Sequence, residues 1–267
     1  MSGLRKVLML HGFVQSDKIF RQKTGGLRKS LAKMGYELWY PCGPELVDKR
    51  SLVSDDKAEV DKDAEGEPVY GWWIKSGTPT TGQQYTVPDA TIKYLHDYVV
   101  ENGPFEGVIG FSQGAALAGY LSTGINAILG LTPEEQPPLQ FLVSFSGFRL
   151  EPAAYQQSYD TNSEWVPSLH VQGGLDAVVS EERVRRLYDT WPEDKRTLLI
   201  HPGSHFVPNS KQFVTKVCNW LTHVQKITKP PGGKETGTPR GGTIQDDTKP
   251  AALDDDLLQM MDSFGGI

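Results

Sequence analysis

Short apolar segments alternate along this chain with segments of helical periodicity, and this alternation limits the folds open to it. The apolar segments have strand length and are KVLMLHG, YELWYP, FEGVIGF, FLVSFSGF, SLHVQG and RTLLIHPG. Helical patterns separate several of them, at residues 20–35, 88–103, 113–122 and 180–191, and a last one covers 209–225. Strands that alternate with helices are typical of βαβ units. We therefore expect an α/β fold with a mainly parallel sheet flanked by helices.

Composition and charge exclude several classes of function. The net charge of −6 argues against a nucleic-acid-binding surface, which would be basic. No window is apolar for long enough to span a bilayer, and the first apolar run is too short for a signal peptide and is broken by His11. Cys42 and Cys218 make no disulfide framework, and Cys218 lies in an apolar helical pattern as a packed core thiol. We expect a soluble protein of the cytoplasm, with the nucleus as a second compartment.

Three regions differ in character. Residues 1–226 carry the strand and helix patterns and form the predicted α/β domain, with a mobile acidic excursion at about 48–68. Residues 227–249 are rich in Pro, Gly and Thr, which indicates a linker. Residues 250–267 form a short acidic amphipathic segment. That segment either folds back on the domain or stays loose, or it docks in the groove of a protein partner.

The pentapeptide Gly110–Gly114 (GFSQG) has the context of a nucleophile elbow. In that motif a strand feeds a sharp turn that carries a serine, and a helix leaves at once. The strand EGVIGF precedes Ser112 and the small-residue helix QGAALAG follows it. Glycines two residues either side of the serine leave room for the crossing strand and helix, whereas Phe111 is expected in the core. Ser112 is therefore the candidate nucleophile.

A serine nucleophile needs a general base, which is held in turn by an acid. In α/β-hydrolases the chain order is serine, acid, histidine, with the later members on loops after successive strands. Asp176 follows SLHVQG and His205 follows RTLLIHPG, so both fall at the carboxyl ends of strands. The alternatives lie in less suitable segments: Asp160, Asp189 and Asp194 for the acid, and His96, His170, His201 and His223 for the base.

The oxyanion of the tetrahedral intermediate needs backbone N–H donors. One is the residue after the nucleophile, Gln113, at a helix N-terminus. The second is expected in the loop LHGFVQS, where Gly12 allows a close turn and the N–H of Phe13 is the first candidate, with Val14 next. A simple strand-to-helix turn is the alternative interpretation of His11–Gly12.

The segments VLMLHGFVQS, GPFEGVIGFSQGA, SFSGF, PSLHVQGGLDAVV and HPGSHFVPNS together resemble the fungal FSH family of serine hydrolases. That family is related to the human ovarian-cancer-associated serine hydrolase, and within it the chain looks close to the longer yeast paralogue. The resemblance covers about residues 4–225. It implies an α/β-hydrolase fold, a Ser112–Asp176–His205 triad and hydrolysis of carboxylic esters. No cofactor and no metal is implied.

The substrate is less constrained than the reaction. We expect Val14, Trp72, Trp73 and Phe148 to line a pocket for an apolar acyl chain of a small-molecule ester, although core packing is an equal alternative for one of the two tryptophans. A thioesterase would use the same triad, and a peptidase is a weaker rival. The rival of another class is a non-catalytic hydrolase-like scaffold that acts through its C-terminal segment.

Overall fold

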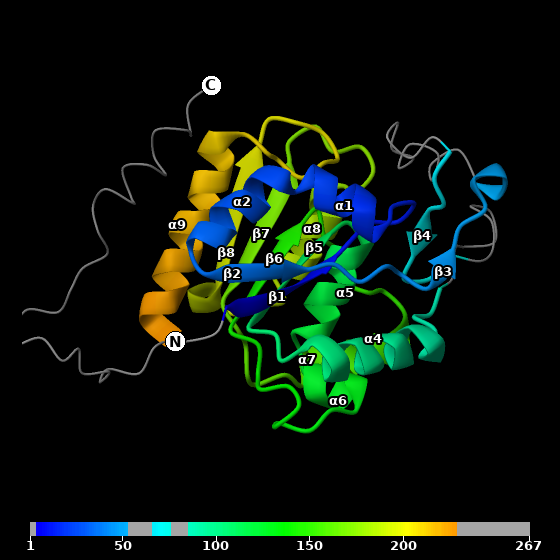
Figure 1. Cartoon of the computed structure of the whole chain (residues 1–267), viewed down its shortest axis with the longest axis horizontal. Helices are drawn as coiled ribbons and strands as arrows, with labels where there is room; N and C mark the ends of the chain where they lie inside the picture. Colours follow the sequence, from blue (N-terminus) through cyan, green and yellow to red (C-terminus); the bar gives the residue numbers. More distant parts are fainter. Residues whose placement is uncertain (1–3, 53–65, 76–84, 229–267) are drawn as a thin grey trace, which may run out of the picture. The chain divides into compact units, whose positions relative to one another are not determined.

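Six parallel strands form the central sheet of the computed structural model, which describes residues 4–52, 66–75 and 85–228 (Figure 1). The strand order is β2-β1-β5-β6-β7-β8, and each neighbouring pair is parallel. These strands are β1 (Arg5–Leu10), β2 (Tyr36–Trp39), β5 (Gly107–Phe111), β6 (Phe141–Phe145), β7 (Ser168–Gly173) and β8 (Arg196–His201). Two short strands, β3 (Glu45–Leu46) and β4 (Tyr70–Gly71), pair antiparallel in a separate sheet. The predicted α/β class with a mainly parallel sheet is confirmed.

Helices cover both faces of the sheet because side chains of alternate strand residues point to opposite faces. On one face, Val7 and Met9 of β1 belong to the same buried cluster as the apolar residues of α2 (Gly25–Lys33) and α9 (Lys211–Thr228). On the other face, Leu8 and Leu10 belong to a cluster with residues of five other helices (Figure 1). These helices are α4 (Asp89–Asn102), α5 (Gln113–Leu121), α6 (Ile125–Leu129), α7 (Ala153–Asp160) and α8 (Glu181–Tyr188). Both faces of β1 are therefore buried.

The helical stretch predicted over residues 20–35 is wrong in one respect, because the structure divides it into two helices. The first helix, α1 (Asp17–Lys23), begins earlier than predicted, since the Ser16 hydroxyl accepts the N–H of Ile19 and caps it. Thr24 separates it from α2. The segment ends as expected at Gly35, whose φ of +82° suits glycine. The helix start predicted at Ser180 is also confirmed, because its hydroxyl accepts the N–H of Arg183.

Part of the predicted organisation lies outside the described residues. Of the acidic excursion at 48–68, the structure describes residues 48–52, which include a short 3-10 helix at Lys49–Ser51, and residues 66–68. The chain divides into two units, Met1–Lys229 and Pro230–Ile267. The linker and C-terminal segment fall within 229–267, apart from residues 227 and 228 at the end of α9. Those predictions stay predictions.

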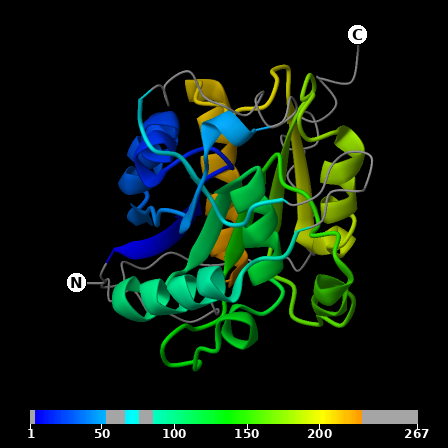
Figure 2. The same cartoon turned by 90° about the vertical axis from the view of Figure 1, so that its right-hand side faces the viewer.

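Because the six strands are parallel, their carboxyl ends lie at one edge of the sheet; Figure 2 shows the same fold turned by 90°. The loop after β1 carries residues 11–16, and Ser112 follows β5 directly. Ser146 follows β6, Asp176 lies in the loop after β7, and His205 lies in the loop after β8. Ligand sites of open parallel sheets form at this edge, since the loops there converge.

The packing of α5 against β1 gives a stability prediction. A Cβ at Gly114 would overlap the carbonyl oxygens of Leu10 and His11, which are fixed backbone atoms. The three heavy atoms nearest to a Cβ at Gly119, five residues along the same helix, all belong to the side chain of Leu187, the nearest at 3.1 Å. Gly114→Ala should lower the free energy of unfolding in urea by about 3 kcal/mol or more.

Gly119→Ala is the matched control, because the helix propensity gained, about 1 kcal/mol, offsets the tight contact with a side chain that can turn. Its free energy of unfolding should stay within about 1 kcal/mol of the wild-type value. Equal losses in the two variants would contradict this account of how α5 is placed.

Candidate active site

Ser112 occupies a strained turn between β5 and α5. Its φ of +50° and ψ of −117° lie in a region that residues with a side chain rarely adopt. The turn is held because the Ser112 N–H donates to the carbonyl of Phe145 at 2.9 Å. A Cβ at Gly110 would lie 2.5 Å from Cα of Ala115, so a residue with a side chain could not bring strand and helix this close. Ser112 therefore lies in a sharp, strained turn directly between a strand and a helix.

Asp176 and His205 form a hydrogen-bonded pair. His205 Nδ1 lies 2.8 Å from Asp176 Oδ2, and both side chains are nearly enclosed. The other carboxylate oxygen accepts the N–H groups of Val178 at 3.0 Å and Val179 at 2.9 Å. The carboxylate is thus fixed on both sides, so it holds the imidazole with Nε2 directed away from it.

The pKa of Asp176 lies below its ordinary value although the side chain is buried. Burial would raise this pKa, but the hydrogen bond and charge of His205, the N–H of Val179 and the hydroxyl of Ser146 together lower it. Ser146 was not singled out from the sequence. It ends SFS after β6, its φ is +48°, and its N–H donates to the carbonyl of Val171 at 2.8 Å. The acid stays ionised because its neighbours replace the water it has lost.

Among the described residues, no hydrogen bond joins Ser112 to His205. The ring of His205 packs against Phe111, the residue before Ser112, with ring centroids 4.7 Å apart. Phe111 is therefore buried in the core, as expected, and also supports the histidine. His205 Nε2 is buried and has no partner among the described residues. Hydrogen bonds between a nucleophile and its base are often long without substrate and tighten when it binds.

The loop after β1 presents free backbone donors. The Gly12 N–H donates to the side chain of Gln15 at 3.1 Å, and Val14 has a φ of +57°. Within the described ranges, the N–H groups of Phe13 and Gln113 have no acceptor. Gln113 is the first residue of α5, where N–H groups have no partner within the helix and the dipole favours negative charge. The arrangement can receive an oxyanion.

His11 anchors this loop in the neutral state. It is completely buried, its Nδ1–H donates to the Gly12 carbonyl at 2.7 Å, and its Nε2 accepts the N–H of Gly43 at 2.8 Å. Burial lowers its pKa to about 4, against smaller opposing effects of the Gly12 hydrogen bond and the Asp17 charge. The turn at His11–Gly12 between β1 and α1 is therefore fixed by buried hydrogen bonds of the His11 side chain.

The predicted pocket residues lie mostly in the core. The side chains of Val14, Trp72 and Trp73 are buried completely or almost so, and both tryptophans belong to the main cluster with α4 and α5. Phe148 is also buried, with the Arg183 guanidinium 4.0 Å above its ring. Phe148 and Arg183 line a cavity of about 320 Å³. Val14 and the two tryptophans are therefore core residues in this structure, and their role in a substrate pocket stays a prediction.

The alternative acids and bases lie elsewhere. Asp160 pairs with Arg149 and Asp189 with Arg196, while Asp194 lies in a 3-10 helix before β8. Each of the four remaining histidines has a different environment. His170 is buried in β7, His96 faces the carbonyl of Leu129, His201 packs against Phe206 and Phe213, and His223 is exposed on α9.

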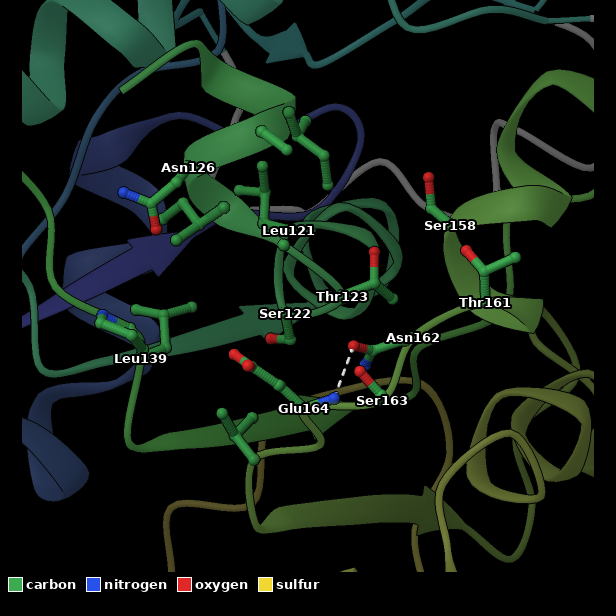
Figure 3. Close-up of a pocket in the computed structure, with 16 residues that line it drawn as sticks. Leu121, Ser122, Thr123, Asn126, Leu139, Ser158, Thr161, Asn162, Ser163 and Glu164 are labelled. Carbon is green, nitrogen blue, oxygen red and sulfur yellow. Dashed lines mark hydrogen bonds between the residues drawn. The ribbon is translucent and has the colours of Figure 1, made fainter. Parts of the chain in front are cut away.

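A second cavity, of about 360 Å³, opens near the amino end of β6 (Figure 3). It is bounded by the end of α5 and by residues 161–164, and the side chains of Ser122, Thr161 and Asn162 face it. Ser112 lies at the opposite end of α5, so this cavity is separate from the Asp176–His205 pair. In the part of the chain that the structure describes, no group of three or more His, Cys, Asp or Glu side chains could hold a metal, and no helix is long and apolar enough to cross a membrane.

Comparison with known proteins supports the same class. The model of the serine hydrolase (FSH1) family matches residues 1–217. Family of serine hydrolases 3 of Saccharomyces cerevisiae is 53% identical over 99% of each chain, and Family of serine hydrolases 2 of the same yeast is 50% identical over 81% of this chain and 97% of its own. Human esterase OVCA2 is 30% identical over 76% of this chain and 89% of its own.

Solved structures with low sequence identity share the fold. Zea mays acyl-protein thioesterase 2 superposes with a TM-score of 0.52 at 19% identity, over 84% of this chain and 95% of its own. A variant of Arabidopsis thaliana SOBER1 gives 0.55 at 16% identity, over 83% of this chain and 99% of its own. The sheet and its helices are therefore those of an α/β-hydrolase.

The state of His11 gives a pH prediction. In the unfolded chain this histidine takes up a proton below about pH 6.5, whereas in the folded protein it stays neutral until about pH 4. The unfolded state therefore binds more protons between these values, so stability falls as the pH falls. Between pH 7 and pH 5 His11 should contribute about 2 kcal/mol to the loss in free energy of unfolding.

His11→Gln isolates this contribution, since glutamine does not titrate. Urea unfolding at pH 7 and pH 5 should show a smaller loss for the variant than for the wild type. Identical losses would mean that His11 is not held neutral by burial.

Proposed function

Because this chain belongs to the serine hydrolase (FSH1) family, we propose that it hydrolyses carboxylic esters with an apolar acyl chain through Ser112, His205 and Asp176. One observation carries the proposal. His205 is held by Asp176 at 2.8 Å, its Nε2 has no partner among the described residues, and its ring rests on Phe111 beside the strained Ser112. A buried imidazole with one nitrogen fixed and the other unused is what a general base requires.

Each group then has one role. Ser112 Oγ attacks the acyl carbonyl carbon while His205 Nε2 takes the hydroxyl proton, and Asp176 stabilises the imidazolium that forms. The N–H groups of Gln113 and Phe13 donate to the oxyanion. His205 next gives its proton to the leaving alkoxide, which departs as the alcohol. Water then attacks the acyl-enzyme, with His205 again as the base, and the acid is released.

Two exposed apolar side chains support an apolar acyl group. Leu175 precedes Asp176 and is 72% exposed, and Phe206 follows His205 and is 46% exposed. The relatives named esterase OVCA2 support oxygen esters as the first substrates to test. Thioesters belong in the same series, since the same groups would serve a thiolate leaving group.

The triad is tested by removing its members singly and together. Ser112→Ala and His205→Ala should each lower kcat by about 10⁴-fold or more, and the double variant should be scarcely slower, since the two groups act as a unit. A fluorophosphonate probe should label the wild type at Ser112 and leave Ser112→Ala unlabelled.

Ser122→Ala is the control, because Ser122 is a buried serine just after the last residue of the same helix, with its hydroxyl bonded to the Ala118 carbonyl. Its rate and labelling should match the wild type. A wild type that takes no label would favour the non-catalytic scaffold, and a Ser112→Ala that labels as strongly would contradict Ser112 as the nucleophile.

A chain-length series tests the substrate class. For p-nitrophenyl esters, kcat/KM should rise with acyl length by up to about fourfold per CH₂, the factor for burying one methylene. Leu175→Ser and Phe206→Ser should flatten this rise. Ile227→Ser, at an exposed apolar position of α9, should leave it unchanged. A rate that does not depend on chain length would exclude the apolar acyl site.

A further inference from the structure

We propose that the side chain of Gln113 is a positioning residue that fixes the two oxyanion donors relative to each other through the Gly71–Trp73 segment. The inference rests on the proposed function, because it concerns the same oxyanion site. It differs from the role of the Gln113 backbone, whose N–H is itself one of the donors. The side chain reaches away from the reaction and binds a segment about 40 residues earlier in the chain.

The Gln113 amide uses both of its ends on buried backbone. Its Oε1 accepts the N–H of Trp72 at 2.7 Å, and its Nε2 donates to the carbonyl of Trp73 at 2.9 Å. The residue is 4% exposed, so no water replaces these bonds if they are lost. The uncharged amide thus supplies an acceptor at one end and a donor at the other.

The same segment holds the loop that carries the other donor. Trp72 Nε1 donates to the His11 carbonyl at 2.8 Å, and the two rings lie 4.9 Å apart. Tyr70 and Gln15 exchange antiparallel hydrogen bonds, of 2.6 Å from the Tyr70 N–H and 3.3 Å from the Gln15 N–H. His11 and Gln15 flank Phe13 on either side. Both ends of the donor loop are therefore tied to residues 70–72.

The far side of the segment is fixed to the core. The Thr91 hydroxyl donates to the Trp72 carbonyl at 2.9 Å, and the Trp73 ring stacks on Tyr85 at 5.3 Å. A continuous set of buried contacts thus runs from the loop of Phe13 through Trp72 to Gln113. Oxyanion stabilisation depends on donor placement within fractions of an ångström, so releasing Gln113 should reduce it without removing either donor.

Gln136 offers a matched control within the chain. It is completely buried, its Oε1 accepts the Phe105 N–H at 2.8 Å, and its Nε2 donates to the Phe105 carbonyl at 2.8 Å. The same kind of amide clamp therefore exists next to the amino end of β5, away from Ser112. Its loss should destabilise the fold in the same way but leave the oxyanion donors in place.

The experiment compares full-length Gln113→Met and Gln136→Met with the wild type. The concentration of folded, active protein in each sample is first determined by titration with a fluorophosphonate. Gln113→Met should lower kcat about 10- to 100-fold with KM within about threefold. It should weaken inhibition by a trifluoromethyl ketone, which forms a tetrahedral oxyanion on Ser112, by a similar factor. Gln136→Met should lower Tm but keep kcat and the inhibition constant.

Gln113→Glu keeps the inference testable if the methionine variant does not fold. A protonated carboxyl can both accept from Trp72 and donate to Trp73, whereas a carboxylate repels the Trp73 carbonyl. The kcat of this variant, divided by the wild-type kcat at the same pH, should rise as the pH falls from 8 to 6. If the Gln113 side chain had only a structural role, the ratio of the two kcat values would not rise as the pH falls.

The outcomes separate the two proposals. A wild type that takes no label at Ser112 overturns the proposed function and this inference with it. A wild type that is labelled, together with Gln113 variants of wild-type kcat and inhibition, overturns the positioning role alone. Equal losses of kcat in Gln113→Met and Gln136→Met overturn it as well.

Discussion

The close crossing of α5 over β1 and β5 is the constraint on which the site depends. It requires that residues 110 and 114 have no side chain, because Cβ atoms there would overlap neighbouring backbone. The crossing brings Ser112 into its left-handed conformation, points the N-terminus of α5 at the carboxyl edge, and brings the Gln113 amide against the Trp72–Trp73 backbone. One steric condition therefore sets the place of Ser112, the proposed nucleophile, of one proposed oxyanion donor, and of the segment that supports the other proposed donor.

Strained backbone and buried polar groups both lie at the carboxyl edge of the sheet. The described residues other than glycine with positive φ are Val14, Ser112 and Ser146, and they lie in the loops after β1, β5 and β6. Such conformations persist only where surrounding contacts over-determine them, which is common at functional sites. Asp176 follows the same logic, since burial alone would raise its pKa and its hydrogen bonds reverse the effect. The strained backbone and the buried charge at this edge are unfavourable in free energy, and the packing on both faces of the sheet holds them in place.

Local pattern predicted the fold well because β5, β6 and β7 are buried along their whole length and therefore appear as continuous apolar runs. Glycine spacing indicated the turn at Ser112, and chain order indicated Asp176 and His205 at strand ends, where the structure has them; their catalytic roles are proposals.

Contacts between residues far apart in the chain leave no local pattern in the sequence, so they were not predicted. The amide of Gln113 meets Trp72 across 41 residues, and Ser146 supports Asp176 from another strand. The tryptophans suggested a pocket wall, yet they are buried because they anchor the 70–73 segment. The helices α6, of 5 residues, and α7, of 8 residues, are too short to show a helical period.

The central claim is that acyl transfer passes through Ser112 at this crossing. Rapid quenching of the full chain in acid during turnover of a slowly hydrolysed ester, followed by mass spectrometry of the intact protein and its peptides, tests it most directly. The account predicts a mass increase of one acyl group, located on Ser112, that decays when the ester is exhausted. An ester hydrolysed without any covalent adduct, or an adduct on another residue, would contradict it.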